Sequence, residues 1–312
     1  MLKQIPFVVA VLLFAFTAAS APKEANVAYS SSVPVLDGDI SGDPAWKHLP
    51  WCGDGFTILR KSDPPNCATR FKALYTADAL YLAVECMEKN IDKMRLEERP
   101  VEYYNYDVTE LFFEATPGEV IHFIFSARDS KNEQIDGKTL VRTKGQTAWA
   151  AKSKICADRW TTEYLVPLAL LAVDPSRSSV AVPFNMCRHT TPDNQYSTWN
   201  PTKGFASREG FGKLRFAPAP KEASETVAVL AKRPHPLALI AKWNAVCGDP
   251  FWRVTLESNG ELAEKLGKMA ALENLGGRTV EFDDALNLLD SRKAAAESAH
   301  RERLSRQFFG HP

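Results

Sequence analysis

Short apolar runs separated by polar turns occupy the chain from about residue 26 to residue 216. The clearest pair, 68–75 and 80–86, is joined by the turn Thr76-Ala77-Asp78, which is the pattern of a β-hairpin. Comparable runs lie at 108–113, 120–125, 149–155, 160–166, 180–187 and 212–216. Many short strands at regular spacing, with few helices between them, indicate a sandwich or barrel rather than an α/β fold. The pattern therefore predicts an all-β domain, an antiparallel two-sheet β-sandwich of jelly-roll-like form.

The pattern changes after Phe216. A proline-containing stretch follows, Ala217 to Ala223, and proline favours extended backbone. In 261–272 and beyond, apolar residues recur at steps of three and four, which is typical of helices. The predicted organisation is a sandwich over 22–216, a linker over 217–225 and an α-helical C-terminal region over 226–312. We expect this tail to be dispensable for the sandwich.

The N-terminus has the layout of an export signal. Lys3 precedes an apolar run from Ile5 to Ala18, and small residues follow through Ala21. This is the order of a secretory signal peptide, here 1–21, and the run is shorter than the ~20 residues that a spanning helix needs. The expectation is a secreted or periplasmic protein with no membrane segment beyond the signal.

Export would place the cysteines where disulfides persist. The chain has six of them: Cys52, Cys67, Cys86, Cys156, Cys187 and Cys247. Cys52 and Cys67 bracket a short loop rich in Gly, Asp and Pro, so they are the expected disulfide pair, although spacing cannot decide connectivity. No C-x-x-C occurs, and a cysteine metal cluster is not expected.

Charge and motifs narrow the class of function. Lys+Arg and Asp+Glu number 38 each, for a formal net charge of +0, which lacks the basic excess of a nucleic-acid-binding protein. No G-x-S-x-G, H-E-x-x-H or P-loop pattern is present, so an enzyme is not expected. Asp107, Glu110 and Glu114 leave open a carboxylate pair for glycoside hydrolysis.

Five segments carry a more specific signal. They are Val35-Leu-Asp-Gly-Asp-Ile-Ser-Gly-Asp-Pro-Ala-Trp46, the hairpin 71–84, the strand 107–114, the strand 160–167, and Trp199-Asn-Pro followed by Phe211-Gly-Lys-Leu-Arg-Phe216. In this order they resemble family 9 of the carbohydrate-binding modules, over about 26–216. The resemblance implies a non-catalytic sandwich that grips the end of a sugar chain, with structural calcium in some members.

By position, the resemblance assigns the two aromatic rings that clamp a sugar to Tyr104 and Trp199. Both lie in loop-like stretches, where an exposed ring can cover the apolar face of a pyranose. Glu110 matches a family glutamate that contacts the sugar, and Asn105 and Asn200 flank the two aromatics. Trp46, Trp149 and Trp160 are expected in the core, and Asp107 is expected to orient a strand start.

One position departs from the family pattern. The family arginine that binds sugar hydroxyls falls on Ile124, which leaves three alternatives: a different ligand, compensation by Arg128 or Arg188, or a lost activity. Two further readings therefore stay open. The first is a structural or interaction sandwich that has lost its sugar. The second is a haem-binding redox sandwich, as in related folds, that uses Met or His side chains. The available residues for it are Met87, His122, Met186 and His189.

Overall fold

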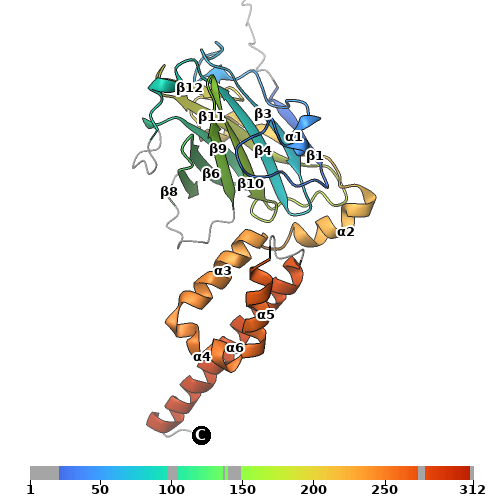
Figure 1. Ribbon diagram of the computed structural model, residues 1–312, viewed down its shortest axis with the longest axis vertical. Helices are drawn as coiled ribbons and strands as arrows, with labels where there is room; N and C mark the ends of the chain where they lie inside the picture. Colours follow the sequence, from blue (N-terminus) through green and yellow to red (C-terminus); the bar gives the residue numbers. More distant parts are fainter. Residues whose placement is uncertain (1–20, 97–104, 136–137, 140–148, 273–277, 310–312) are drawn as a thin grey trace, which may run out of the picture.

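The computed structural model describes residues 21–96, 105–135, 138–139, 149–272 and 278–309 (Figure 1). A domain built of strands occupies the first part of the chain, and helices coloured orange to red extend from one end of it. The predicted signal peptide, 1–21, lies almost wholly outside the described residues. Within the described part, no helix combines the length and hydropathy that crossing a membrane requires.

Thirteen strands of the described residues form one continuous hydrogen-bonded sheet. They are β1 Glu24–Tyr29, β2 Thr57–Ile58, β3 Thr69–Tyr75, β4 Ala79–Met87, β5 Val108–Thr116, β6 Glu119–Ser126, β7 Lys131–Ile135, β8 Lys138–Thr139, β9 Ala150–Ile155, β10 Arg159–Pro167, β11 Val180–Thr190, β12 Gln195–Thr198 and β13 Gly212–Phe216. The order along the main path is β8-β7-β6-β5-β11-β13-β1-β3-β4-β10-β9, with β12 paired to β11 and β2 paired to β12.

The domain is predominantly β, as predicted, but the sheet is mixed rather than purely antiparallel. β1 pairs in parallel with β13 through its first residues, Glu24 opposite Lys213, and in parallel with β3 through its last, Ala28 opposite Leu74. β1 therefore joins two halves of one sheet, the half that ends in β13 and the half that begins with β3. The expectation of two separate antiparallel sheets is wrong. The sheet curls on itself, and the two halves face each other across one core.

Alternation along the strands builds that core. On β3, Phe71, Ala73 and Tyr75 point inward, and the ring of Phe71 meets Phe184 of the opposite half at 5.8 Å between centroids. Trp149 and Trp160 are buried in the same cluster. The predicted core role of these two tryptophans is confirmed.

The aspartate-rich segment 35–46 packs against the β domain and has a structural role. Asp43 caps the short helix α1 (Pro44–Lys47), and the buried Trp46 donates from Nε1 to Glu163 Oε1 at 2.6 Å. Glu163 Oε2 also accepts from the Gly38 amide at 2.8 Å. The segment thereby covers the outer face of β4, which explains why β4 is buried on both faces.

The helical region starts earlier than expected. α2 (Lys221–Leu230) begins inside the segment 217–225 predicted as a linker. Its Ala223 and Val227, with Ala231 just beyond, belong to the main core of the β domain. α2 is therefore an integral part of that domain.

The remaining helices form a second body. They are α3 Pro236–Gly248, α4 Arg253–Ser258, α5 Gly260–Ala270 and α6 Thr279–Phe309, with short 3-10 turns elsewhere at Ile91–Lys93, Arg208–Gly210 and Pro250–Trp252. Leu239, Leu266, Phe282, Leu286 and Leu289 make a hydrophobic core of their own, separate from that of the β domain. The predicted helical tail is confirmed.

All six cysteines are free, so the expected Cys52–Cys67 disulfide is wrong. The two thiols contact different groups. Cys52 Sγ lies 3.7 Å from the carbonyl oxygen of Phe71 on β3, whereas Cys67 is buried with its Sγ 3.9 Å from Glu88 Oε1.

Removing the tail tests the division into two bodies. A chain truncated after Lys232 keeps α2 on the β domain and should unfold as cooperatively as the full chain. Truncation after Pro218 also removes Val227 and two buried alanines, and should cost about 2–4 kcal/mol of unfolding free energy. Urea titration of both chains, followed by circular dichroism, measures the difference. Equal stability of the two truncated chains would contradict the assignment of α2 to the β domain.

Candidate functional site

A hollow lies on the outer face of the half-sheet formed by β7, β6, β5 and β11. Its place follows from the alternation on β5, where Leu111 and Phe113 point into the main core while Glu110 and Phe112 point outward. The hollow measures about 430 Å³ and is lined by Glu110, Phe112, Val120, His122, Gln134, Phe205, Ala206 and Arg208. Volumes of roughly 300–1,000 Å³ are usual for small-molecule sites.

Its polar centre is the pair formed by Glu110 and His122. His122 Nε2 donates to Glu110 Oε2 at 2.7 Å, and both side chains are largely buried, with His122 13% exposed and Glu110 8% exposed. The His122 ring stacks on Phe112 with a centroid separation of 4.1 Å and an interplanar angle of 17°. Register confirms the shared face, because His122 stands opposite Phe112 across the β5–β6 ladder.

The wall of the hollow is the loop between β12 and β13. Phe205 is half-buried there and makes edge contacts with Phe112 at 6.4 Å and Tyr196 at 5.9 Å between ring centroids. Tyr196 in turn stacks on His189 at 4.2 Å. Burial lowers the pKa of His189 and raises that of Tyr196, so both favour their uncharged forms. The wall is aromatic with uncharged polar edges.

Trp199 is not the exposed platform that the sequence predicted. Its side chain is 1% exposed, and it packs against Phe71 at 5.3 Å and Phe184 at 5.7 Å between ring centroids. A Cβ on Gly212 would lie 2.7 Å from the Trp199 ring, which shows how closely the backbone covers it. Trp199 is a core residue because it follows β12 on the inward side.

Both polar atoms of the Asn200 side chain form hydrogen bonds within the protein. Its Oδ1 accepts from the Lys23 amide at 2.9 Å, and its Nδ2 donates to the Gly210 carbonyl at 2.8 Å. These bonds close the loop that carries Phe205. Asn200 shapes the wall of the hollow instead of lining it.

The other predicted residues near the start of β5 are partly described. Tyr104 lies outside the described residues. Asn105 is half-buried and precedes Tyr106, whose carbonyl accepts from His189 Nδ1 at 3.1 Å. Asn105 thus stands at the edge of the face that bears His189.

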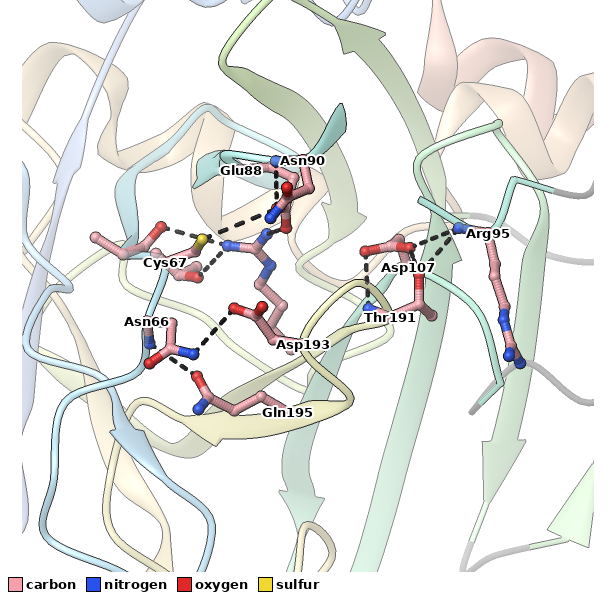
Figure 2. Close-up of polar contacts among 12 residues, drawn as sticks. Asn66, Cys67, Glu88, Asn90, Arg95, Asp107, Thr191, Asp193 and Gln195 are labelled. Atoms are coloured by element: carbon pink, nitrogen blue, oxygen red, sulfur yellow. Dashed lines mark hydrogen bonds and ion pairs between the residues drawn. The ribbon is translucent and has the colours of Figure 1, made fainter. Parts of the chain in front are cut away.

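Arg188 faces away from the hollow. It is fully buried and pairs with the equally buried Glu88, Nη2 to Oε2 at 3.2 Å, while its Nη1 donates to Thr69 Oγ1 at 3.2 Å. Figure 2 shows Glu88 together with Cys67 and Asn90, whose amide donates to Glu88 Oε1. Arg188 therefore cannot compensate for Ile124, because it lies on the opposite face of β11 from Cys187.

Asp107 organises the entry to β5, as expected. Its carboxylate accepts from the Arg95 amide at 3.0 Å and the Thr191 amide at 3.2 Å (Figure 2). Burial raises the pKa of Asp107. The residue ties three separate segments together and takes no part in the hollow.

Arg128 is exposed in the turn after β6 and borders a different depression with Asp129 and Ser153. Ile124 stands directly opposite Glu110 in the β5–β6 register. The position assigned to the family arginine therefore lies on the same face of the sheet as Glu110, where it holds a buried apolar side chain that does not line the hollow.

Two of the residues considered for haem binding point to different faces. Met186 points into the core, whereas His122 lines the outer hollow, so the two lie on opposite faces of the sheet. No group of three or more His, Cys, Asp or Glu side chains suited to a metal ion occurs among the described residues.

Sequence reasoning placed Glu110 in the site and missed Phe205, Phe112, Gln134 and Arg208, and it considered His122 only for haem. One signal was available for Phe205, a large apolar residue in the otherwise polar stretch 200–210. The alternation on β5 and β6 also placed Phe112 and His122 on the face of Glu110.

Comparison with known proteins gives a family and a set of similar folds. The family described as "Carbohydrate family 9 binding domain-like" matches residues 36–216. A family 9 carbohydrate-binding module from Caldicellulosiruptor kristjanssonii, solved with cellotriose, is 17% identical with a TM-score of 0.48. The same module solved with glucose is 17% identical with a TM-score of 0.46. Each alignment covers 64% of this chain and 97% of the module. No curated protein matches the chain.

Proposed function

The chain belongs to the carbohydrate family 9 binding domain-like family, and we propose that the hollow beside Glu110 and Phe205 holds a neutral sugar unit. The observation that carries the proposal is the combination of a half-exposed aromatic wall with a carboxylate–imidazole pair in one concavity. A pyranose offers an apolar C–H face and a ring of hydroxyls. A site for a pyranose therefore needs an apolar surface and hydrogen-bonding groups in the same concavity.

Phe205 supplies the apolar surface in this proposal. The ring is held from behind by Phe112 and Tyr196, so little conformational entropy remains to be lost on binding. Covering one face of a sugar ring contributes on the order of 1–2 kcal/mol. Phe205 thus takes the role that the sequence assigned to Trp199.

Charges in the hollow favour an uncharged ligand. Glu110 is bonded to His122 at the centre, and Arg208 lies 3.9 Å from Glu114 at the rim. An acidic sugar would place its carboxylate near Glu110, at a cost from like-charge repulsion. Glycoside hydrolysis uses a pair of carboxylates, and among the described residues that line the hollow Glu110 is the one carboxylate, which supports binding without chemical change.

We further propose that the protein is exported, on the basis of the N-terminal apolar run. A neutral glycan outside the cytoplasm would then be its ligand. Fractionation of cells that produce the full-length chain, with N-terminal sequencing of the mature protein, tests this point.

Substitutions in the hollow test sugar binding. Phe205→Ala should weaken binding by about tenfold or more, or ~1–3 kcal/mol, and Glu110→Gln should have a comparable effect through a lost charge-assisted hydrogen bond. A glycan array identifies the ligand among neutral gluco-, xylo- and manno-oligosaccharides, and calorimetry measures the affinities.

Phe251→Ala is the matched control, because Phe251 is 85% exposed on the helical tail. It should leave affinity unchanged. If Phe205→Ala binds as tightly as the unmodified protein, the hollow is not the site. If no glycan binds at all, the remaining reading is an interaction domain that has lost its sugar.

A further inference from the structure

We propose that Glu110 and His122 together accept hydrogen bonds from two neighbouring hydroxyls of a sugar. Sugar binding then requires the neutral imidazole of His122, so the affinity falls in acid. In this way His122 takes the place of the arginine that Ile124 replaces. The inference rests on the proposed function and defines the chemistry and the regulation of the same hollow.

The hydrogen bond between the two side chains sets the tautomer of His122. A carboxylate accepts, so the proton lies on His122 Nε2 in the 2.7 Å contact with Glu110 Oε2. In a neutral imidazole the other ring nitrogen, Nδ1, is then an acceptor. Stacking on Phe112 keeps the ring in this plane. The orientation is therefore fixed before a ligand arrives.

Two acceptor atoms remain for a ligand. The hydrogen bond between the two described side chains uses Glu110 Oε2 and His122 Nε2, which leaves Glu110 Oε1 and His122 Nδ1 as the second acceptor atom of each. Both residues line the hollow. Adjacent hydroxyls of a sugar ring each carry one donor, and a pair of acceptors on one wall matches such a diol.

Protonation of His122 changes this match. Nδ1 then carries a proton and becomes a donor, so one of the two acceptors is lost. The imidazolium also forms a stronger, charge-assisted bond to Glu110, which competes with the sugar hydroxyl for the carboxylate. Both effects weaken binding as the imidazole becomes charged.

Among the described residues, few other titratable groups lie beside His122. On β5 the charged neighbours that face it are Glu110 and Glu114, and the β12–β13 loop contributes Arg208. β7 presents the uncharged Gln134 opposite His122. The charged residue next to it, Glu133, is on the inner face, bonded to Trp149.

A second histidine, His189, lies on the same outer face. Burial lowers its pKa, its Nδ1 is bonded to the Tyr106 carbonyl, and its side chain is not among those that line the hollow. The pH response of the hollow is therefore assigned to His122.

The test compares affinities at pH 7.5 and pH 5.0 by calorimetry, with the oligosaccharide of the neutral gluco-, xylo- and manno- panel that binds most tightly. The unmodified protein should bind about tenfold more weakly at pH 5.0, the effect expected for one lost hydrogen bond. His122→Gln keeps an amide donor and an acceptor oxygen and does not titrate. Whatever its affinity at pH 7.5, it should bind with the same affinity at pH 5.0.

His48→Gln is the control, because His48 is exposed at the end of α1. It should keep the full pH dependence. Circular dichroism at both pH values confirms that each protein is folded. Equal affinity of the unmodified protein at the two pH values overturns this inference alone, as does an unchanged pH dependence in His122→Gln. Absence of binding at both pH values overturns the proposed function itself.

Discussion

Replacing Trp199 with alanine should lower the free energy of unfolding by about 3–5 kcal/mol, the cost of emptying a well-packed aromatic site. The indole is 1% exposed and contacts rings from both halves of the sheet, Phe71 and Phe184. Backbone at Gly212 closes over it, so the surroundings have little freedom to collapse into the void. Urea titration followed by tryptophan-independent circular dichroism measures the loss.

The same titration on Phe205→Ala separates core from site. Phe205 is half-exposed on a loop, so its removal should change stability by less than about 1 kcal/mol while reducing affinity. A Trp199→Ala protein that keeps its stability but no longer binds sugar would restore the role of Trp199 as a binding platform.

Replacing Glu88 with glutamine should also destabilise the protein strongly, by about 3–5 kcal/mol. Glu88 and Arg188 are both 0% exposed and lie 3.2 Å apart. Glutamine keeps the size of the side chain but leaves the guanidinium charge buried without a counter-charge. Loss of one partner from a buried pair is costly because water cannot solvate the other.

A double variant shows whether the cost comes from the unpaired charge. Glu88→Gln combined with Arg188→Met removes both charges and should recover a large part of the lost stability. Thermal unfolding of the single and double variants gives the comparison. Equal stability of Glu88→Gln and the unmodified protein would mean that water reaches the pair, in contradiction to its burial.

Local patterns in the sequence were sufficient for much of the fold. Short apolar runs separated by polar turns predicted the strands β3 to β6 and β10, and successive side chains of a strand point to opposite faces of the sheet. The same parity places Glu110 and Phe112 on one face of β5 and Leu111 on the other.

The pairing of strands depended on long-range contacts. β1 is only six residues long, yet it bridges β13 and β3 in parallel, and nothing within 24–29 specifies either partner. The start of α2 at Lys221 was equally hidden, since a short helix with few apolar residues is stabilised by the core it docks on rather than by its own propensity.

The sequence by itself determined the family, the predominance of strands and the helical tail, and it singled out Glu110, which lines the candidate hollow. These rest on residue order and on periodicity, which are local. Only the tertiary structure decided which loop aromatic is exposed: Trp199 and Phe205 stand six residues apart in similar surroundings, and their difference arises from Phe71, Phe184 and Gly212. The tertiary structure also decided that Arg188 is buried in an ion pair with Glu88, that Cys52 and Cys67 form no disulfide, and that His122 is hydrogen-bonded to Glu110. Burial and pairing are properties of neighbours brought together from distant parts of the chain, so they appear only when the sheet has closed.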